Sequence, residues 1–153
     1  MIAVGSDHAG FELKCEILRH LANAGVAYKD YGTYSTESVD YPTYALKVCN
    51  AVINGEAETG ILVCGTGIGV SIAANKVKGI RAALCSNEFS TEFTRRHNDA
   101  NVMCLGGRVT STEDALKYVD IFLNTPFEGG KHKRRIDMIA DIENGSADFT
   151  EEK

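Results

Sequence analysis

Residues 60 to 71 read GILVCGTGIGVS, and this stretch indicates the fold of the whole chain. An apolar run of strand length ends at a cysteine, and a turn with three glycines in five residues leads back into small and apolar side chains. A glycine-rich turn between a strand and a helix directs several backbone N–H groups toward one point. We therefore predict a strand that ends near Cys64, a turn over 65–69 that can hold an anion, and a short helix through Asn75.

The same alternation of strand and helix continues on both sides of this stretch. The short apolar runs MIAVGSD, VAYKDYG, IRAALC and NVMCLGG predict the other strands, and amphipathic segments between them predict helices. This pattern predicts a Rossmann-like three-layer α/β sandwich with a five-stranded parallel sheet and an added C-terminal helix over 129–145. We expect a single domain over residues 1–145 and a flexible acidic tail over 146–153.

Composition narrows the class of protein. The 153 residues are 44% hydrophobic and 24% charged, as in ordinary globular proteins, and the net charge of −5 argues against a nucleic-acid partner. No apolar run approaches the roughly 18 residues of a membrane span, and the N-terminus lacks a basic signal-peptide region, so we expect a cytoplasmic protein. The five cysteines form no CxxC pair and no Cys/His pair has metal-ligand spacing, which favours free thiols and no metal site.

Polar side chains follow the predicted strands where a parallel sheet binds its ligands, at the carboxyl ends. Asp7 and His8 follow the first strand, the turn from Cys64 follows the third, and Arg108 follows the fifth. His97 and Asn98 instead end the helix after the fourth strand. There a protonated imidazole would complement the helix dipole, so a structural and a catalytic interpretation of His97 stay equally open.

The glycine-rich turn matches none of the common phosphate-binding motifs. Val70 stands where a GxGxxG fingerprint needs its third glycine and where a cysteine phosphatase needs its arginine, and no Gly-Lys-Ser/Thr sequence follows the turn. The turn is either an anion site or a tightly packed bend. Cys64 is correspondingly either a base, favoured by the dipole of the following helix, or a buried structural thiol.

The segment KHKRR, residues 131–135, places four cations at the start of the last predicted helix, where they oppose the helix dipole. Lys131 and Arg135 share one face of that helix, and Arg108 could join them around a phosphate monoester. A phosphate pocket, a thiol base and an anion-stabilising turn suit proton transfer next to the carbonyl of a small phosphorylated sugar.

At these residues the chain resembles the ribose-5-phosphate isomerase B family, which includes galactose-6-phosphate isomerase subunits. The resemblance is carried by GSDHAGFELK (5–14), ESVDYP (37–42), GILVCGTGIGVSIAANKVKGIRAALC (60–85), RRHNDANVMCLGGRV (95–109) and EGGKHKRR (128–135). It implies an aldose–ketose isomerase of the non-oxidative pentose phosphate pathway that interconverts D-ribose 5-phosphate and D-ribulose 5-phosphate without a cofactor. It also implies a homodimer or homotetramer with active sites shared between subunits.

The resemblance also implies roles for individual residues. Cys64 would move the proton through a cis-enediolate, and His97 would help to open the sugar ring. The substrate would be bound by Asp7, His8, Tyr41, Gly65, Thr66, Gly67, Ile68, Gly69, Asn98, Arg108, Lys131 and Arg135. Family members usually carry arginine where this chain has Lys131, so either Lys131 or Arg134 would take over that phosphate contact.

Three alternatives remain from the sequence. One is an isomerase of a six-carbon sugar 6-phosphate, such as allose or galactose 6-phosphate. The second is a non-catalytic sugar-phosphate sensor, which would need the phosphate site but neither Cys64 nor His97. The third, a cysteine redox protein, is disfavoured because the chain has no CxxC motif or evident resolving cysteine.

Overall fold

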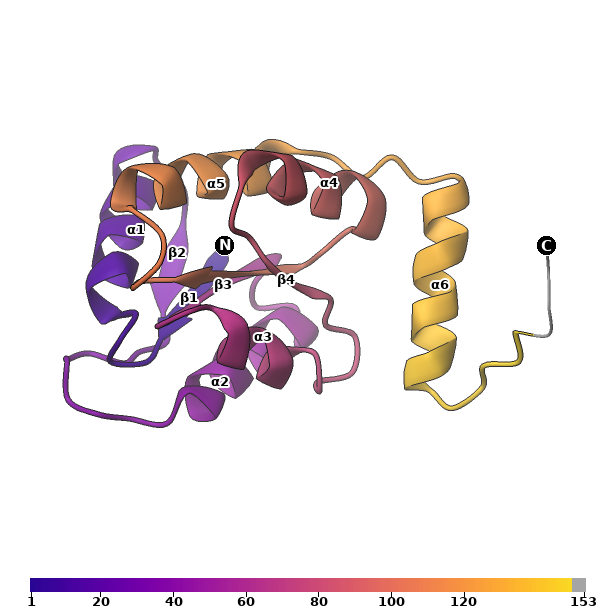
Figure 1. The fold of residues 1–153 in the computed structure, drawn as a ribbon, viewed down its shortest axis with the longest axis horizontal. Coiled ribbons are helices and arrows are strands. Elements are labelled where there is room, and N and C mark those ends of the chain that lie inside the picture. The colour runs from indigo at the N-terminus through magenta and orange to yellow at the C-terminus, as the bar shows by residue number, and fades with distance from the viewer. Residues whose placement is uncertain (150–153) are drawn as a thin grey trace.

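The computed structural model describes residues 1–149, which form a parallel sheet covered by helices (Figure 1). The strands are β1 (Ile2–Ser6), β2 (Tyr28–Asp30), β3 (Thr59–Cys64), β4 (Ala82–Leu84) and β5 (Val102–Gly106), all parallel, in the order β2-β1-β3-β5-β4. The helices are α1 (Phe11–Asn23), α2 (Tyr41–Ile53), α3 (Ile68–Ala74), α4 (Glu88–Asn98), α5 (Thr112–Asn124) and α6 (Lys131–Glu143). The predicted fold class, with its five parallel strands and added C-terminal helix, is confirmed.

The three layers follow from alternation along the strands, because successive side chains point to opposite faces of a sheet. Ile61 and Val63 of β3 pack with α1 and α5 on one face, whereas Leu62 and Cys64 pack with α2 and α3 on the other. Both faces are therefore apolar along the central strands, as expected for a sheet covered on both sides. The side chain of Cys64 consequently lies on the face covered by α2 and α3.

Lys14 is a fully buried charge in the first helix. Its Nζ donates to Oδ1 of Asp30 at 2.6 Å and to the carbonyl oxygen of Thr33 at 2.5 Å. A buried ammonium group needs such partners, because desolvation without them is costly. The contact ties α1 to the end of β2 and to the first part of the loop that leads to α2.

Two elements at one side of the molecule, β4 and α6, are exposed to solvent. β4 is an edge strand, and its Leu84 is exposed. α6 stands apart from the sheet beyond the end of α4 (Figure 1), and Ile136 is its one buried residue. The chain beyond α6 begins the expected acidic tail, of which residues 150–153 lie outside the described part of the chain.

Strand order locates the expected ligand site. The chain moves from β1 outward to β2 and then returns to β3 on the other side of β1, so the order reverses between β1 and β3. Ligands of open α/β sheets bind at such a switch point, outside the carboxyl ends of the strands. The residues that directly follow β1 and β3 are Asp7 and the glycine-rich turn after Cys64.

Candidate active site

Cys64 is the last residue of β3 and is only 4% exposed. The backbone N–H of Gly67 donates to its Sγ at 3.1 Å, so the turn folds back over the sulfur. Gly67 has a φ of +80°, and a Cβ there would lie 2.9 Å from the carbonyl carbon of Leu105. Only glycine fits this position without strain, and the donor is therefore held in place by the fold.

Arg108 lies against the same turn. The N–H of Gly107 donates to the carbonyl oxygen of Cys64 at 2.7 Å, and the N–H of Arg108 donates to that of Gly65 at 2.9 Å. A Cβ added to Gly65 would lie 3.4 Å from Nη1 of Arg108, which shows how closely the guanidinium approaches the backbone. The cation predicted after the fifth strand thus lies beside the cysteine turn.

Tyr41 covers the other end of the turn. A Cβ at Gly69 would lie 2.7 Å from Cζ of Tyr41, so the ring rests directly on the glycine. Within the turn, the N–H of Ile68 donates to Oγ1 of Thr66 at 3.2 Å. The predicted turn residues and Tyr41 therefore form one continuous surface at the carboxyl end of β3.

Asp7 and His8 complete this group of side chains. Asp7 is 6% exposed; its N–H donates to the carbonyl oxygen of Val63 at 3.2 Å, and its Oδ1 accepts from the N–H of Gly10 at 3.0 Å. Nδ1 of His8 accepts from the N–H of Val39 at 3.1 Å. Because an accepting ring nitrogen carries no proton, the proton of His8 sits on Nε2, which is left to donate to a ligand.

His97 and Asn98 lie near the amino ends of the strands, opposite to the carboxyl ends that carry the cysteine turn. The carbonyl oxygen of Asn98 accepts from Nε of Arg81 at 2.8 Å, and Arg81 directly precedes β4. Cys64 pairs with Gly106, at the far end of β5. The rise of a strand separates the two ends of β5 by about 13 Å. Within one chain, the structure does not bring His97 or Asn98 to Cys64.

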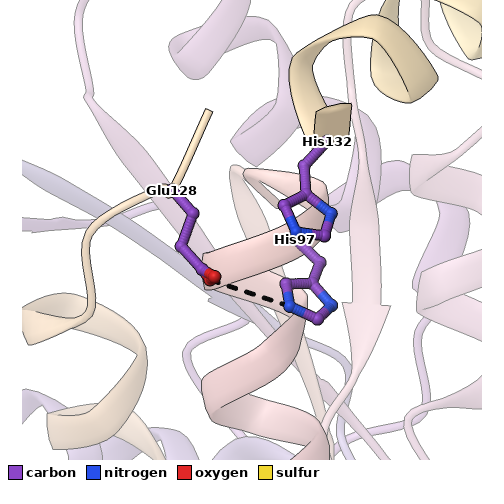
Figure 2. Close-up of side chains that lie close together, drawn as sticks. All are labelled: His97, Glu128 and His132. Atoms are coloured by element: carbon purple, nitrogen blue, oxygen red, sulfur yellow. Dashed lines mark ion pairs between the residues drawn. The ribbon is translucent and has the colours of Figure 1, made fainter. Parts of the chain in front are cut away.

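His97 has its own neighbours at this second location (Figure 2). Its Nε2 lies 3.7 Å from Oε2 of Glu128, and its ring stacks on that of His132 with centroids 3.9 Å apart. Desolvation, followed by the nearby His97, lowers the pKa of His132 from its usual value. Sequence reasoning did not single out Glu128 or His132, although both lie within the basic segment EGGKHKRR.

Lys131 and Arg135 begin α6, next to His132 and far from the cysteine turn. The prediction that Arg108 joins them around one phosphate is therefore not met within a single chain. The connector after α5 is attached to the end of α4, where the N–H of Glu128 donates to the carbonyl oxygen of Arg96 at 3.0 Å, and α6 leads away from the sheet beyond this point (Figure 1). The candidate residues form two groups at opposite ends of the strands, one after the inner strands β1, β3 and β5 and the other beside the start of β4.

The fold and the cysteine turn define a parallel α/β protein with a ligand site at the carboxyl ends of β1, β3 and β5. The family model described as Ribose/Galactose Isomerase matches residues 2–139. The chain belongs to this family, which confirms the resemblance drawn from its motifs.

Individual relatives are similar over nearly the whole chain. The ribose-5-phosphate isomerase B of Escherichia coli (strain K12) is 51% identical over 142 residues, which are 93% of this chain and 95% of the relative. A solved ribose-5-phosphate isomerase B of Clostridium thermocellum has a TM-score of 0.93 at 49% identity, covering 95% of this chain and 99% of that one. That of Mycoplasma genitalium with bound ribulose-5-phosphate has a TM-score of 0.89 at 44% identity, covering 94% and 95%.

No helix over residues 1–149 combines the length and the apolar character needed to cross a bilayer.

Proposed function

We propose that this chain is an aldose–ketose isomerase that interconverts D-ribose 5-phosphate and D-ribulose 5-phosphate. The observation that carries the proposal is the thiol of Cys64 under the N–H of Gly67, at the switch point of the sheet. Relatives with 51% and 49% identity bear the name ribose-5-phosphate isomerase B. Membership of the family and the position of the thiol thus point to the same reaction.

The chemistry needs one base and one group that stabilises an oxyanion. The Cys64 thiolate takes the proton from C2 of the open-chain aldose, and the electrons move to the carbonyl oxygen to give a cis-enediolate. The proton of the O2 hydroxyl passes to O1, and the same thiol then returns its proton to C1, which gives the ketose with its carbonyl at C2. The N–H groups of the 65–69 turn hold the charge on the enediolate oxygens, as preorganised donors do in other enzymes that form oxyanions.

The remaining residues bind and open the sugar. His97 assists opening of the furanose ring, and Asp7 and Asn98 hold sugar hydroxyls. Tyr41 and Thr66 line the pocket. The phosphate is bound by the Nε2–H of His8 and by Arg108, with Lys131 and Arg135 as further cations. Lys131 supplies a positive charge but not the bidentate hydrogen bonding of arginine. Arg134 is the residue that could replace the usual arginine at this phosphate contact.

Two groups of residues at opposite ends of the strands of one chain require a second copy of the chain to form one site. A groove beside the edge strand β4 is lined by Leu84, Phe89, His97 and Asn98, among others. At one end Leu84 touches the cysteine turn, because a Cβ at Gly67 would lie 2.5 Å from its Cδ1. At the other end lie His97 and Asn98.

A two-fold axis through the middle of this groove exchanges its ends. Such a homodimer brings His97 and Asn98 of each copy to the cysteine turn of the other. Exposed apolar side chains support a contact here: Ile68 is 50%, Ile72 57% and Phe89 69% exposed. Two dimers could assemble into a homotetramer by other surfaces. A cytoplasmic location is part of the proposal, and the five free cysteines support it because thiols stay reduced in that compartment.

The test is turnover of ribose 5-phosphate in EDTA by the wild type and by Cys64→Ala, with allose and galactose 6-phosphates as competing substrates. We expect the pentose phosphate to turn over fastest, and Cys64→Ala to lose turnover while it still binds the sugar phosphate. Binding without turnover in the wild type would instead indicate a sensor. Faster turnover of a hexose phosphate would move the enzyme to the six-carbon branch of the family.

A further inference from the structure

His97, Glu128 and His132 form a compact group outside the cysteine turn (Figure 2). One nitrogen from each imidazole and one carboxylate oxygen all lie within 4.8 Å of one another. Ligand atoms of a tetrahedral site with bonds of about 2.1 Å are about 3.4 Å apart. The distance of 3.7 Å between Nε2 of His97 and Oε2 of Glu128 is already close to that value.

Each of the three side chains is held near the others by independent contacts. The backbone N–H of Glu128 is bonded to the carbonyl oxygen of Arg96, which fixes the connector beside the last turn of α4. His132 lies in the first turn of α6, and its N–H donates to the carbonyl oxygen of Gly129 at 3.1 Å. The ring of His97 is enclosed between Phe93, which meets it edge-on at 4.8 Å, and His132.

We propose that His97, Glu128 and His132 bind a divalent transition metal such as Ni²⁺, Co²⁺ or Zn²⁺, and that the bound metal inhibits the isomerase reversibly. Two imidazoles and one carboxylate suit these metals, whereas Mg²⁺ and Ca²⁺ prefer oxygen ligands. Three protein ligands leave the rest of the coordination sphere to water. The inhibitory part rests on the proposed function, because the metal withdraws the His97 nitrogen from ring opening.

Imidazole nitrogens bind a metal through lone pairs that lie in the plane of the ring. The rings of His97 and His132 are stacked nearly parallel, with centroids 3.9 Å apart and an angle of 10° between their planes. One ring therefore turns out of the stack when both nitrogens bind the same ion.

Nearby cations limit the affinity. Nε of Arg96 lies 3.3 Å from Oε2 of Glu128. The positive charges of Lys131 and Arg135 lie near His132 and repel a metal cation bound there. Arg96 retains Glu92 as an acceptor at 3.0 Å when a metal takes the Glu128 oxygen. A half-exposed ion pair of this kind contributes little stability, so its loss does not prevent binding. We therefore expect a regulatory or inhibitory site of moderate affinity, not a permanently filled one.

Co²⁺ titration of the EDTA-treated and dialysed protein tests the site directly. We expect about one Co²⁺ per chain, with d–d absorption and no thiolate charge-transfer band, because no cysteine takes part. Glu128→Gln and His132→Gln should each weaken binding about tenfold or more. His20→Gln is the matched control, since His20 pairs with Asp120, at 2.7 Å, on another surface. The Co²⁺ affinity of this variant should equal that of the wild type.

The second readout is turnover with and without Co²⁺, each variant compared with its own metal-free rate. We expect inhibition in the wild type and His20→Gln, reversal by EDTA, and inhibition at least tenfold less sensitive in Glu128→Gln. Equal Co²⁺ affinity in all variants, or a thiolate band, would overturn the site. Binding that leaves turnover unchanged would overturn the inhibitory part, and the metal-free rate would still report on the isomerase itself.

Discussion

The backbone amide of Gly67 donates a hydrogen bond to the sulfur of Cys64 over 3.1 Å. A donor aimed at this atom stabilises a thiolate more than a neutral thiol, because a charge-assisted hydrogen bond is the stronger of the two. The same backbone position admits no side chain, since its φ is +80° and Leu84 and Leu105 lie directly beyond its Cα. The turn thus supplies a fixed donor to the proposed base.

The first prediction concerns this turn. Gly67→Ala forces a Cβ to within 2.5 Å of Leu84 and 2.9 Å of the Leu105 backbone, so we expect a loss of about 2–4 kcal/mol in unfolding free energy. Displacement of the turn should lower kcat roughly 100-fold or more, as the loss of an oxyanion donor does. Urea unfolding and steady-state kinetics measure the two effects.

Gly55→Ala is the matched control for backbone strain. Gly55 has a φ of +78°, but a Cβ there meets nothing within 4 Å, and the residue lies in the connection before β3. We expect a loss of about 1 kcal/mol and an unchanged kcat. If Gly67→Ala behaved like Gly55→Ala in both measurements, the turn would have no special part in catalysis.

The second prediction concerns Lys14. Lys14→Met removes the cation but leaves Asp30 and the Thr33 carbonyl without their buried partner, so we expect a loss of about 3 kcal/mol in unfolding free energy. Lys133→Met, which breaks an exposed pair with Asp137, should change stability by less than about 1 kcal/mol. Equal effects in the two variants would show that the buried ammonium is not a structural contact.

The third prediction concerns stability at high pH. Burial raises the pKa of Cys49 to about 12 and that of Cys85 to about 11, against a usual 9.0. Above pH 9 the unfolded chain releases these protons while the folded chain keeps them, so unfolding becomes more favourable as pH rises. We expect stability to decline from pH 9 to about 11 by this route.

Cys85→Ser isolates the contribution of one thiol, because substitution costs that do not depend on pH cancel when slopes are compared. We expect its stability to fall less steeply than that of the wild type between pH 9 and 11, as urea unfolding at each pH would show. Parallel curves for the two proteins would mean that the Cys85 thiol ionises alike in the folded and unfolded chains.

The fold was predictable because its signals are local. Turn glycines and periodic apolar residues marked the strands and helices, and Leu13, Ile17 and Leu21 are buried on one side of α1. The order of the strands and the burial of Lys14 were not predictable in this way. Lys14 is accommodated by Asp30 and Thr33, and no local pattern shows that these partners will meet it.

The sequence predicted which residues belong to the candidate site better than it predicted how they are arranged in space. The rule that ligands bind at the carboxyl ends of parallel strands predicted that Asp7, Cys64 and Arg108 lie together, because each stands at the end of a strand or within two residues after it. The neighbours of His97 depend on how the connector after α5 returns to α4, and a motif read along the chain contains no such information. The group of His97, Glu128 and His132 therefore emerged only from the three-dimensional structure.

The separation of Cys64 and His97 within one chain makes a mixed-dimer experiment the most direct test. Cys64→Ala and His97→Ala should each be strongly impaired as homodimers, the latter by roughly 100-fold or more. After the two are unfolded together and refolded, half of the dimers pair one copy of each, and each mixed dimer has one site with both residues. We predict that turnover returns to about a quarter of the wild-type value. Turnover that stays at the level of the separate variants would contradict an active site shared between two copies.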